Sequence, residues 1–180
     1  MTFHTVAEIL ASNEEATSRF VSGVAACTNS QAGFRPSAEE WTIGEIVEHV
    51  NIVNGGFLRI TGKLLRQAEA DPKPAPADLN LGGVIVDKDG VQAPKFQAPE
   101  TVRPKGGVAI ADAIAGLQQT IAGFAELQAR LEAVDLSEQK FPHPAVGPLS
   151  AYQWLILLAE HSDRHLGQIE RVKAAAGFPA

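Results

Sequence analysis

Residues 110–131 read IADAIAGLQQTIAGFAELQARL, and this stretch decides the fold. Its apolar side chains recur every three or four residues, at Ile110, Ile114, Leu117, Ile121, Phe124, Leu127 and Leu131. This spacing places them along one side of an α-helix, which completes a turn about every 3.6 residues. A continuous apolar seam of this length is typical of a helix that packs in a bundle. The stretch therefore predicts one long helix of a helical bundle.

Three further segments have the same periodicity, at about residues 6–27, 42–70 and 150–176. Two of them begin with the pattern of a capping box, Thr42-Ile-Gly-Glu45 and Ser150-Ala-Tyr-Gln153. In a capping box the hydroxyl accepts an early backbone N–H while the acidic or amide side chain reaches back to the cap. Four helices of similar length favour side-by-side packing. We predict an all-α protein, a four-helix bundle that forms a single domain over residues 1–180.

The connection between the second and third helices is too long for a tight turn. It is rich in proline, and its middle, residues 83–92, reads GVIVDKDGVQ. The β-branched residues on either side of Asp89-Gly90 predict a short β-hairpin, and an irregular surface insertion is the alternative. A connection of this length allows the third helix to begin at the far end of the bundle, as in bundles with a crossover.

Composition excludes several classes of protein. The chain has 180 residues, 45% of them apolar, and a net charge of −6 with a pI near 5.3. An acidic chain has no electrostatic reason to bind nucleic acid or an anionic membrane surface. A single cysteine, Cys27, cannot form an internal disulfide, and no apolar run is long enough to span a bilayer. With no signal peptide recognised at the start, we expect a soluble, cytoplasmic protein.

Three histidines suggest a metal site. His161 and His165 lie one helical turn apart on one face, and they continue an apolar stripe that points to the core. His49 lies on or beside the inward face of the second helix. Imidazole nitrogens bind divalent ions such as zinc and nickel, and three of them leave coordination positions open for water or substrate. The alternative is three core or groove histidines that bond to carbonyl or hydroxyl groups.

Other polar residues have simpler interpretations. Glu45 is explained by its capping role, although it could also orient His49. The spacing of Glu160 and Arg164 predicts a surface ion pair. His143, between two prolines, is expected in a solvated loop, and it could gate access if that loop folds over the metal. Because Ser162 stands where a zincin would carry its general-base Glu, metalloprotease chemistry is not indicated.

Two motifs resemble those of the DinB-like superfamily of bacterial four-helix proteins. They are Trp41-Thr-Ile-Gly-Glu-Ile-Val-Glu-His49 and His161-x-x-Arg-His165-Leu-Gly-Gln-Ile. The resemblance covers most of the chain, including the long crossover. It implies an up-up-down-down type of bundle, frequently a homodimer, with one divalent ion, zinc or nickel, on His49, His161 and His165. Some members of the family are transferases or isomerases that use low-molecular-weight thiols.

Two classes of function follow. The first is a metal-dependent transferase whose ion binds a small thiol as thiolate; the same open site could instead activate water for hydrolysis. The second is a non-catalytic, stress-associated metal-binding module. The expected partner is a small molecule, with neither nucleic acid nor membrane involved. No cluster of Arg or Lys accompanies the three histidines in the sequence, so nothing there indicates a carboxylate-bearing thiol.

Overall fold

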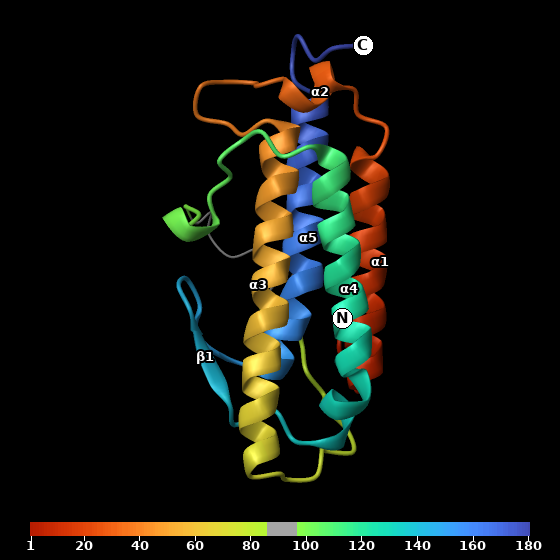
Figure 1. Ribbon diagram of the computed structural model, residues 1–180, viewed down its shortest axis with the longest axis vertical. Coiled ribbons are helices and arrows are strands. Elements are labelled where there is room, and N and C mark those ends of the chain that lie inside the picture. The colour runs from red at the N-terminus through yellow and green to blue at the C-terminus, as the bar shows by residue number, and fades with distance from the viewer. Residues whose placement is uncertain (86–96) are drawn as a thin grey trace.

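Four long helices pack side by side in the computed structural model, which describes residues 1–85 and 97–180 (Figure 1). They are α1 (Val6–Val24), α3 (Ile43–Ala70), α4 (Ile110–Ala133) and α5 (Ala151–Lys173). Around them lie the short helix α2 (Asn29–Gly33), the 3-10 turn η1 (Glu100–Val102) and the strands β1 (Lys140–His143) and β2 (Gly147–Ser150). The predicted all-α four-helix bundle is confirmed.

The helix starts follow the sequence signals. Thr42 and Ser150 cap α3 and α5 through the predicted capping boxes, and Thr5 caps α1 in the same way. The first helix ends at Val24, earlier than the predicted Cys27, and α2 follows after a short turn with its own cap at Thr28. These caps fix where each helix begins, and so fix the register in which α3 and α5 face each other.

The helices run up, down, down and up in chain order (Figure 1). Arg19 of α1 pairs with Asp163 of α5, and Lys173, further along α5, reaches the carbonyl of Gly23, so α1 and α5 are parallel. The up-up-down-down order implied by the family resemblance is therefore wrong. The physical reason is that only the connection between α3 and α4 is long enough to return along the bundle, whereas the other two connections reverse the chain.

The structure contains a β-hairpin that the sequence patterns did not predict. Strands β1 and β2 pair antiparallel between α4 and α5, with Lys140 opposite Ser150 and His143 opposite Gly147. The predicted hairpin at residues 83–92 lies mostly outside the described residues. The described part of the crossover is tied to the bundle base, where Leu81 forms a bridge with Phe3 and Pro74 with Val134.

The apolar interior forms two clusters along the bundle. One lies toward the hairpin end and includes Phe57, Leu155 and Trp154, and the other lies toward α2 and includes Phe20 and Ile46. The seam of α4 contributes to both. Among the described helices, none is both long and apolar enough to cross a membrane.

Candidate metal centre

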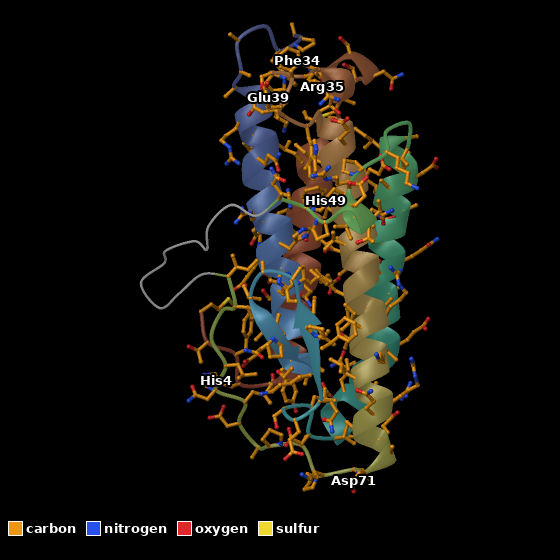
Figure 2. All side chains as sticks on the ribbon, turned by 90° about the vertical axis from the view of Figure 1, so that its left-hand side faces the viewer. His4, Phe34, Arg35, Glu39, His49 and Asp71 are labelled. Carbon is orange, nitrogen blue, oxygen red and sulfur yellow. The ribbon has the colours of Figure 1, made fainter. Side chains whose placement is uncertain are left out.

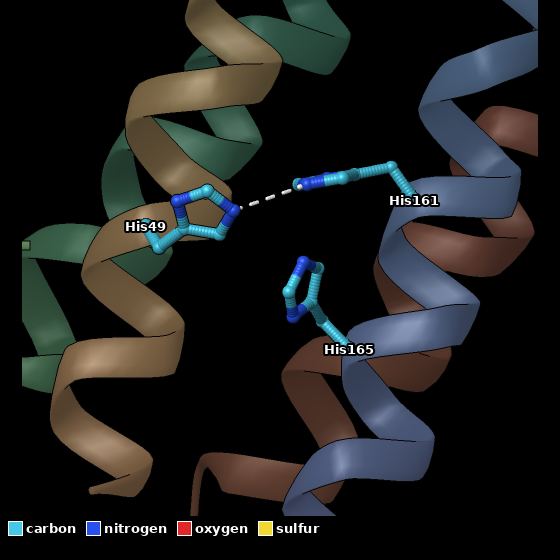
Figure 3. A group of neighbouring side chains, drawn as sticks. All are labelled: His49, His161 and His165. Atoms are coloured by element: carbon cyan, nitrogen blue, oxygen red, sulfur yellow. Dashed lines mark hydrogen bonds between the residues drawn. The ribbon is translucent and has the colours of Figure 1, made fainter. Parts of the chain in front are cut away.

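His49, His161 and His165 lie together between α3 and α5 (Figure 3). The ring of His49 is 5.3 Å from that of His161 and 4.8 Å from that of His165, measured between ring centroids. One nitrogen of each imidazole lies within 4.8 Å of the others. The Nε2 atoms of His49 and His161 are 3.3 Å apart. The structure thus brings the three predicted ligands to one point, in a geometry that could hold one ion.

The bundle topology explains this convergence. His161 and His165 are one turn apart on α5, so their side chains leave the helix on the same face. Helix α3 runs antiparallel to α5, and His49 is directed toward that face from the opposite side (Figure 3). Phe57, further along α3, contacts both Trp154 and His161 and holds the two helices in this register.

Hydrogen bonds at Nδ1 fix the orientation of two of the imidazoles. His49 Nδ1 donates to the backbone carbonyl of Val102 at 2.7 Å, and His165 Nδ1 lies 2.8 Å from Oε1 of Gln168. A carbonyl oxygen only accepts, so each Nδ1 carries the proton and each Nε2 keeps its lone pair. This tautomer is the one that a metal-binding histidine adopts when it ligates through Nε2.

Burial keeps the three imidazoles neutral. It lowers the pKa of His49 and His161, and it lowers the pKa of His165 to about 3. The neighbouring histidines and Arg164 lower the pKa values of His161 and His165 further. Nδ1 of His161 is buried without a hydrogen-bond partner among the described residues. Neutral imidazoles are the form that binds metals, so the residues present fit a divalent ion.

Two glutamates, the buried Glu48 and the half-buried Glu160, connect the site to the crossover. Glu48, next to His49, accepts the backbone N–H groups of Lys105 and Gly106 at 3.0 and 2.9 Å. Glu160, next to His161, accepts those of Val84 and Ile85, the shorter contacts being 2.9 and 2.8 Å. Both described ends of the crossover are therefore held by a carboxylate that directly precedes a histidine of the site.

The Glu160 contacts correct the prediction of an ion pair with Arg164. The carboxylate of Glu160 instead faces the crossover backbone, and burial raises the pKa of its carboxyl. Glu45 has the predicted capping role and pairs with Arg35 at 2.6 Å, so its carboxylate is directed to the helix start rather than to His49. The sequence could not show that Glu160 bonds to the crossover or that Glu45 pairs with Arg35, because these partners lie in other segments of the chain.

The three histidines open into a cleft of about 1020 Å³. The cleft is lined by α3, α5, the hairpin and the segment around η1. Figure 2 views this side of the bundle, with His49 in its upper part and the hairpin below it. A volume of this size is typical of small-molecule sites. Both tryptophans, Trp41 and Trp154, line it, and the ring of Trp41 lies 4.9 Å from that of His49.

His143 lines the same cleft, which agrees with the alternative that its loop folds over the metal site rather than with a fully solvated loop. It ends β1, its ring is 5.4 Å from that of Trp154, and burial lowers its pKa. Its Nδ1 accepts the backbone N–H groups of Ala145 and Val146, which leaves the proton of the neutral ring on Nε2. The flanking prolines suggested a solvated loop, and only the pairing of β1 with β2 places this residue beside the site.

The fold and the histidine cluster define a four-helix-bundle protein with a candidate metal site. The chain belongs to the DinB superfamily, whose family model matches residues 12–169. This agrees with the resemblance of its two histidine motifs.

Individual relatives are distant. The chain is 26% identical over 144 residues to the uncharacterized protein YuaE of Bacillus subtilis (strain 168), a match that covers 77% of this chain and 81% of YuaE. The structure is similar to that of TT2238, a four-helix bundle protein, with a TM-score of 0.60 and 19% identity, covering 91% of this chain and 97% of TT2238. It is also similar to YfiT from Bacillus subtilis, described as a probable metal-dependent hydrolase with an unusual four-helix bundle topology. That match has a TM-score of 0.59 and 16% identity, and covers 96% of this chain and 87% of YfiT.

Proposed function

We propose that this protein is a metal-dependent transferase that uses a low-molecular-weight thiol. His49, His161 and His165 would hold one divalent ion, zinc or nickel, through their Nε2 atoms. The observation that carries the proposal is the convergence of three neutral imidazoles at the wall of an open cleft. Three protein ligands leave room for a further ligand, which is typical of catalytic rather than structural zinc sites.

The chemistry supplied by the ion would be to lower the pKa of a coordinated thiol, so that it is a nucleophile at neutral pH. The protein's own residues would orient the ligands and shape the cleft. The Val102 carbonyl and Gln168 hold the rings of His49 and His165 in place. The Trp41 and Phe57 rings pack beside the triad and limit the access of water.

The residues that line the cleft favour a thiol over water as the nucleophile. Zincin-type hydrolases place a carboxylate beside the ion as a general base. The described lining has only two carboxylates, Glu39 and Glu40, and both are exposed on the segment that precedes α3. A thiol bound to a metal needs no such base, because the ion itself stabilises the thiolate.

Metal-dependent hydrolysis is a second candidate, because the structurally similar YfiT carries that description. The same open coordination position could bind water in place of a thiol. A purely structural role is less well supported, since a structural ion is normally enclosed by four protein ligands, and the described residues offer three.

The experiment is a thiol panel on protein loaded separately with zinc and with nickel. Small thiols are assayed with a generic electrophile, and ester hydrolysis is assayed in parallel without thiol. We expect thiol transfer that requires both the ion and His161. Hydrolysis without any thiol transfer would favour the second candidate, and metal binding without either activity would favour the non-catalytic module.

A further inference from the structure

The cleft beside the histidines is lined by arginines that come from two different helices. Arg164 and Arg171 come from α5 and Arg59 comes from α3, and all three line the cleft. Arg164 and Arg171 are already close to His165 in the sequence, whereas Arg59 comes from a distant segment, so the expectation that no cationic cluster accompanies the histidines is wrong. Packing of α3 against α5 brings them to one surface in a protein whose net charge is −6.

These arginines lack the partners that other arginines of the chain have. Arg19, Arg35, Arg103 and Arg130 each form an ion pair with a carboxylate. Within the described parts of the chain, no carboxylate lies within 4.0 Å of Arg59, Arg164 or Arg171. Arg164 is half-buried as well as unpaired. An arginine without a carboxylate partner keeps its guanidinium donors available for an anionic ligand.

The side chains of Arg59 and Arg171 reach along their helices toward the histidines. Nη1 of Arg171 is 3.8 Å from the position that a Cβ atom would occupy at Gly167, one turn nearer to His165. On α3, Nη1 of Arg59 is 3.5 Å from the position that a Cβ atom would occupy at Gly55, one turn nearer to His49. In both cases glycine leaves the surface open for the guanidinium.

We propose that the cleft binds a small organic anion whose carboxylate groups pair with these arginines, with Arg164 as the principal contact beside the metal site. This inference rests on the proposed function and specifies its substrate class. A planar guanidinium donates two parallel hydrogen bonds to a carboxylate, which makes arginine well suited to this recognition.

The spacing of the arginines favours carboxylates over a single phosphate. Arg164 and Arg171 are seven positions apart on one helix, or about 10 Å at a rise of 1.5 Å per residue. Arg59 is on the opposite wall. Separated single charges suit separate carboxylates, whereas a phosphate dianion is normally met by several donors that converge on it.

The rest of the cleft suits an apolar portion of the same ligand. Phe57 and Trp154 are buried side chains in ring contact, and the ring of Phe141 in the hairpin is 6.2 Å from that of Trp154. The ligand would therefore have its charged groups along α5 and its apolar part near the hairpin, with the metal site between the two regions.

The test compares two small thiols on the zinc-loaded protein at low ionic strength. Mercaptosuccinate carries two carboxylates, and thioglycerol has hydroxyl groups in their place. Binding is followed by the fluorescence of Trp41 and Trp154, the only tryptophans of the chain, and is repeated by calorimetry. We expect mercaptosuccinate to bind at least about tenfold more tightly, and the difference to shrink as salt is added.

Variants assign the effect to Arg164. R164Q should remove most of the preference for mercaptosuccinate and leave thioglycerol and zinc binding unchanged, while R164K should keep part of the preference. Arg66 is the control, because like Arg164 it has no carboxylate within 4.0 Å among the described residues but it does not line the cleft. R66Q should behave as the wild type.

Succinate and inorganic phosphate complete the experiment, and every result bears on the proposal. Succinate binding that depends on Arg164 supports the anion site, whether or not the thiols bind. If succinate binds in this way and neither thiol binds, the anion site is supported and only the proposed thiol transferase is wrong. Equal binding of both thiols with no effect of R164Q overturns the anion site and leaves the transferase intact. Tighter binding of phosphate than of succinate, or an equal loss in R66Q and R164Q, also overturns it.

Discussion

The two sides of the bundle bury polar residues of different kinds. On the α1–α4 side these are Asn13, Thr17 and Thr120, which do not titrate near neutral pH, and the groove beside Asn13 measures only about 180 Å³. On the α3–α5 side Asn54 and Ser162 are also buried and bond to each other, but His49 and His165 are buried there as well, and with His161 they open into a cleft of about 1020 Å³. The same architecture therefore closes one side by packing and equips the other for binding, so stability and function should respond to different residues.

The largest effect on stability is expected from the closed interior. Phe20 of α1 is completely buried, and Phe20→Ala should lower the free energy of unfolding by about 3–5 kcal/mol through lost burial and a cavity. Zinc bound per folded chain should not change. Phe141, half-buried at the cleft, is the matched control, and Phe141→Ala should cost less. Urea denaturation measures both, and a larger loss in Phe141→Ala would contradict the comparison.

The next largest effect is expected from the metal site. His161→Ala should abolish tight metal binding and leave the helical content nearly unchanged, because the apolar seams of α1 and α4 contain no ligand. At a metal concentration a hundredfold above its dissociation constant, the variant should lack about 2.7 kcal/mol of the wild-type stability.

Circular dichroism, calorimetry and a chelator check this prediction together. Chelator should reproduce the loss in the wild type and change little in the variant. His4→Ala, which alters an exposed histidine paired with Asp78, should behave as the wild type. Complete unfolding of the wild type by chelator would mean that the ion is structural, which would contradict the enzyme interpretation.

The third effect is a pH dependence in the metal-free protein. Burial lowers the pKa of His165 to about 3 in the folded state, whereas the pKa of an unfolded histidine is about 6.5. Below about pH 6.5 the unfolded chain takes up protons that the folded protein refuses, so stability should fall as the pH falls. For this group the slope should approach about 1.4 kcal/mol per pH unit.

Denaturation between pH 7.5 and 4.5 in the presence of chelator measures this slope. His165→Gln removes the titrating group and should flatten the profile. His4 has the opposite sign, because its hydrogen bond to Asp78 raises its pKa, and removing it should not flatten the profile. If stability depends on pH with the same slope in the wild type and in His165→Gln, then the imidazole of His165 can be protonated in the folded protein, which contradicts the prediction.

The smallest effect is expected where the crossover meets the site. Glu48→Gln keeps the volume of the side chain but loses the charge that holds the N–H groups of Lys105 and Gly106. The segment that carries the Val102 carbonyl should loosen, and zinc affinity should fall by about tenfold. Glu45→Gln, one turn earlier on α3, is the control and should leave zinc affinity unchanged. Competition with a metal-sensitive dye measures both, and equal effects would refute a specific role for Glu48.

Local patterns predicted the helices and the three histidines because both depend on helical spacing. The apolar seam at residues 110–131 and the pair His161 and His165 are periodic features of single segments, so they could be recognised without tertiary structure. The hairpin β1–β2 was missed because its strands are short and interrupted by prolines, with no run of β-branched residues.

The features that needed the structure join distant segments. The bond between His49 and Val102 spans 53 positions, and the contacts of Glu160 with the crossover span 75 and 76. No spacing rule relates residues so far apart, and the same holds for Arg59 of α3 and the two cleft arginines of α5. The homodimer and the cytoplasmic location stay predictions, and sedimentation over a range of micromolar concentrations tests the first of them.

X-ray absorption at the zinc edge tests the central claim most directly, because it identifies the ligands of a bound ion in the folded protein. The account predicts three nitrogen ligands at about 2.0–2.1 Å, completed by oxygen from water. One nitrogen should be lost in His49→Ala, and adding a small thiol should replace an oxygen ligand with sulfur. A first shell without histidine nitrogens, or a closed shell that no thiol can enter, would contradict the account.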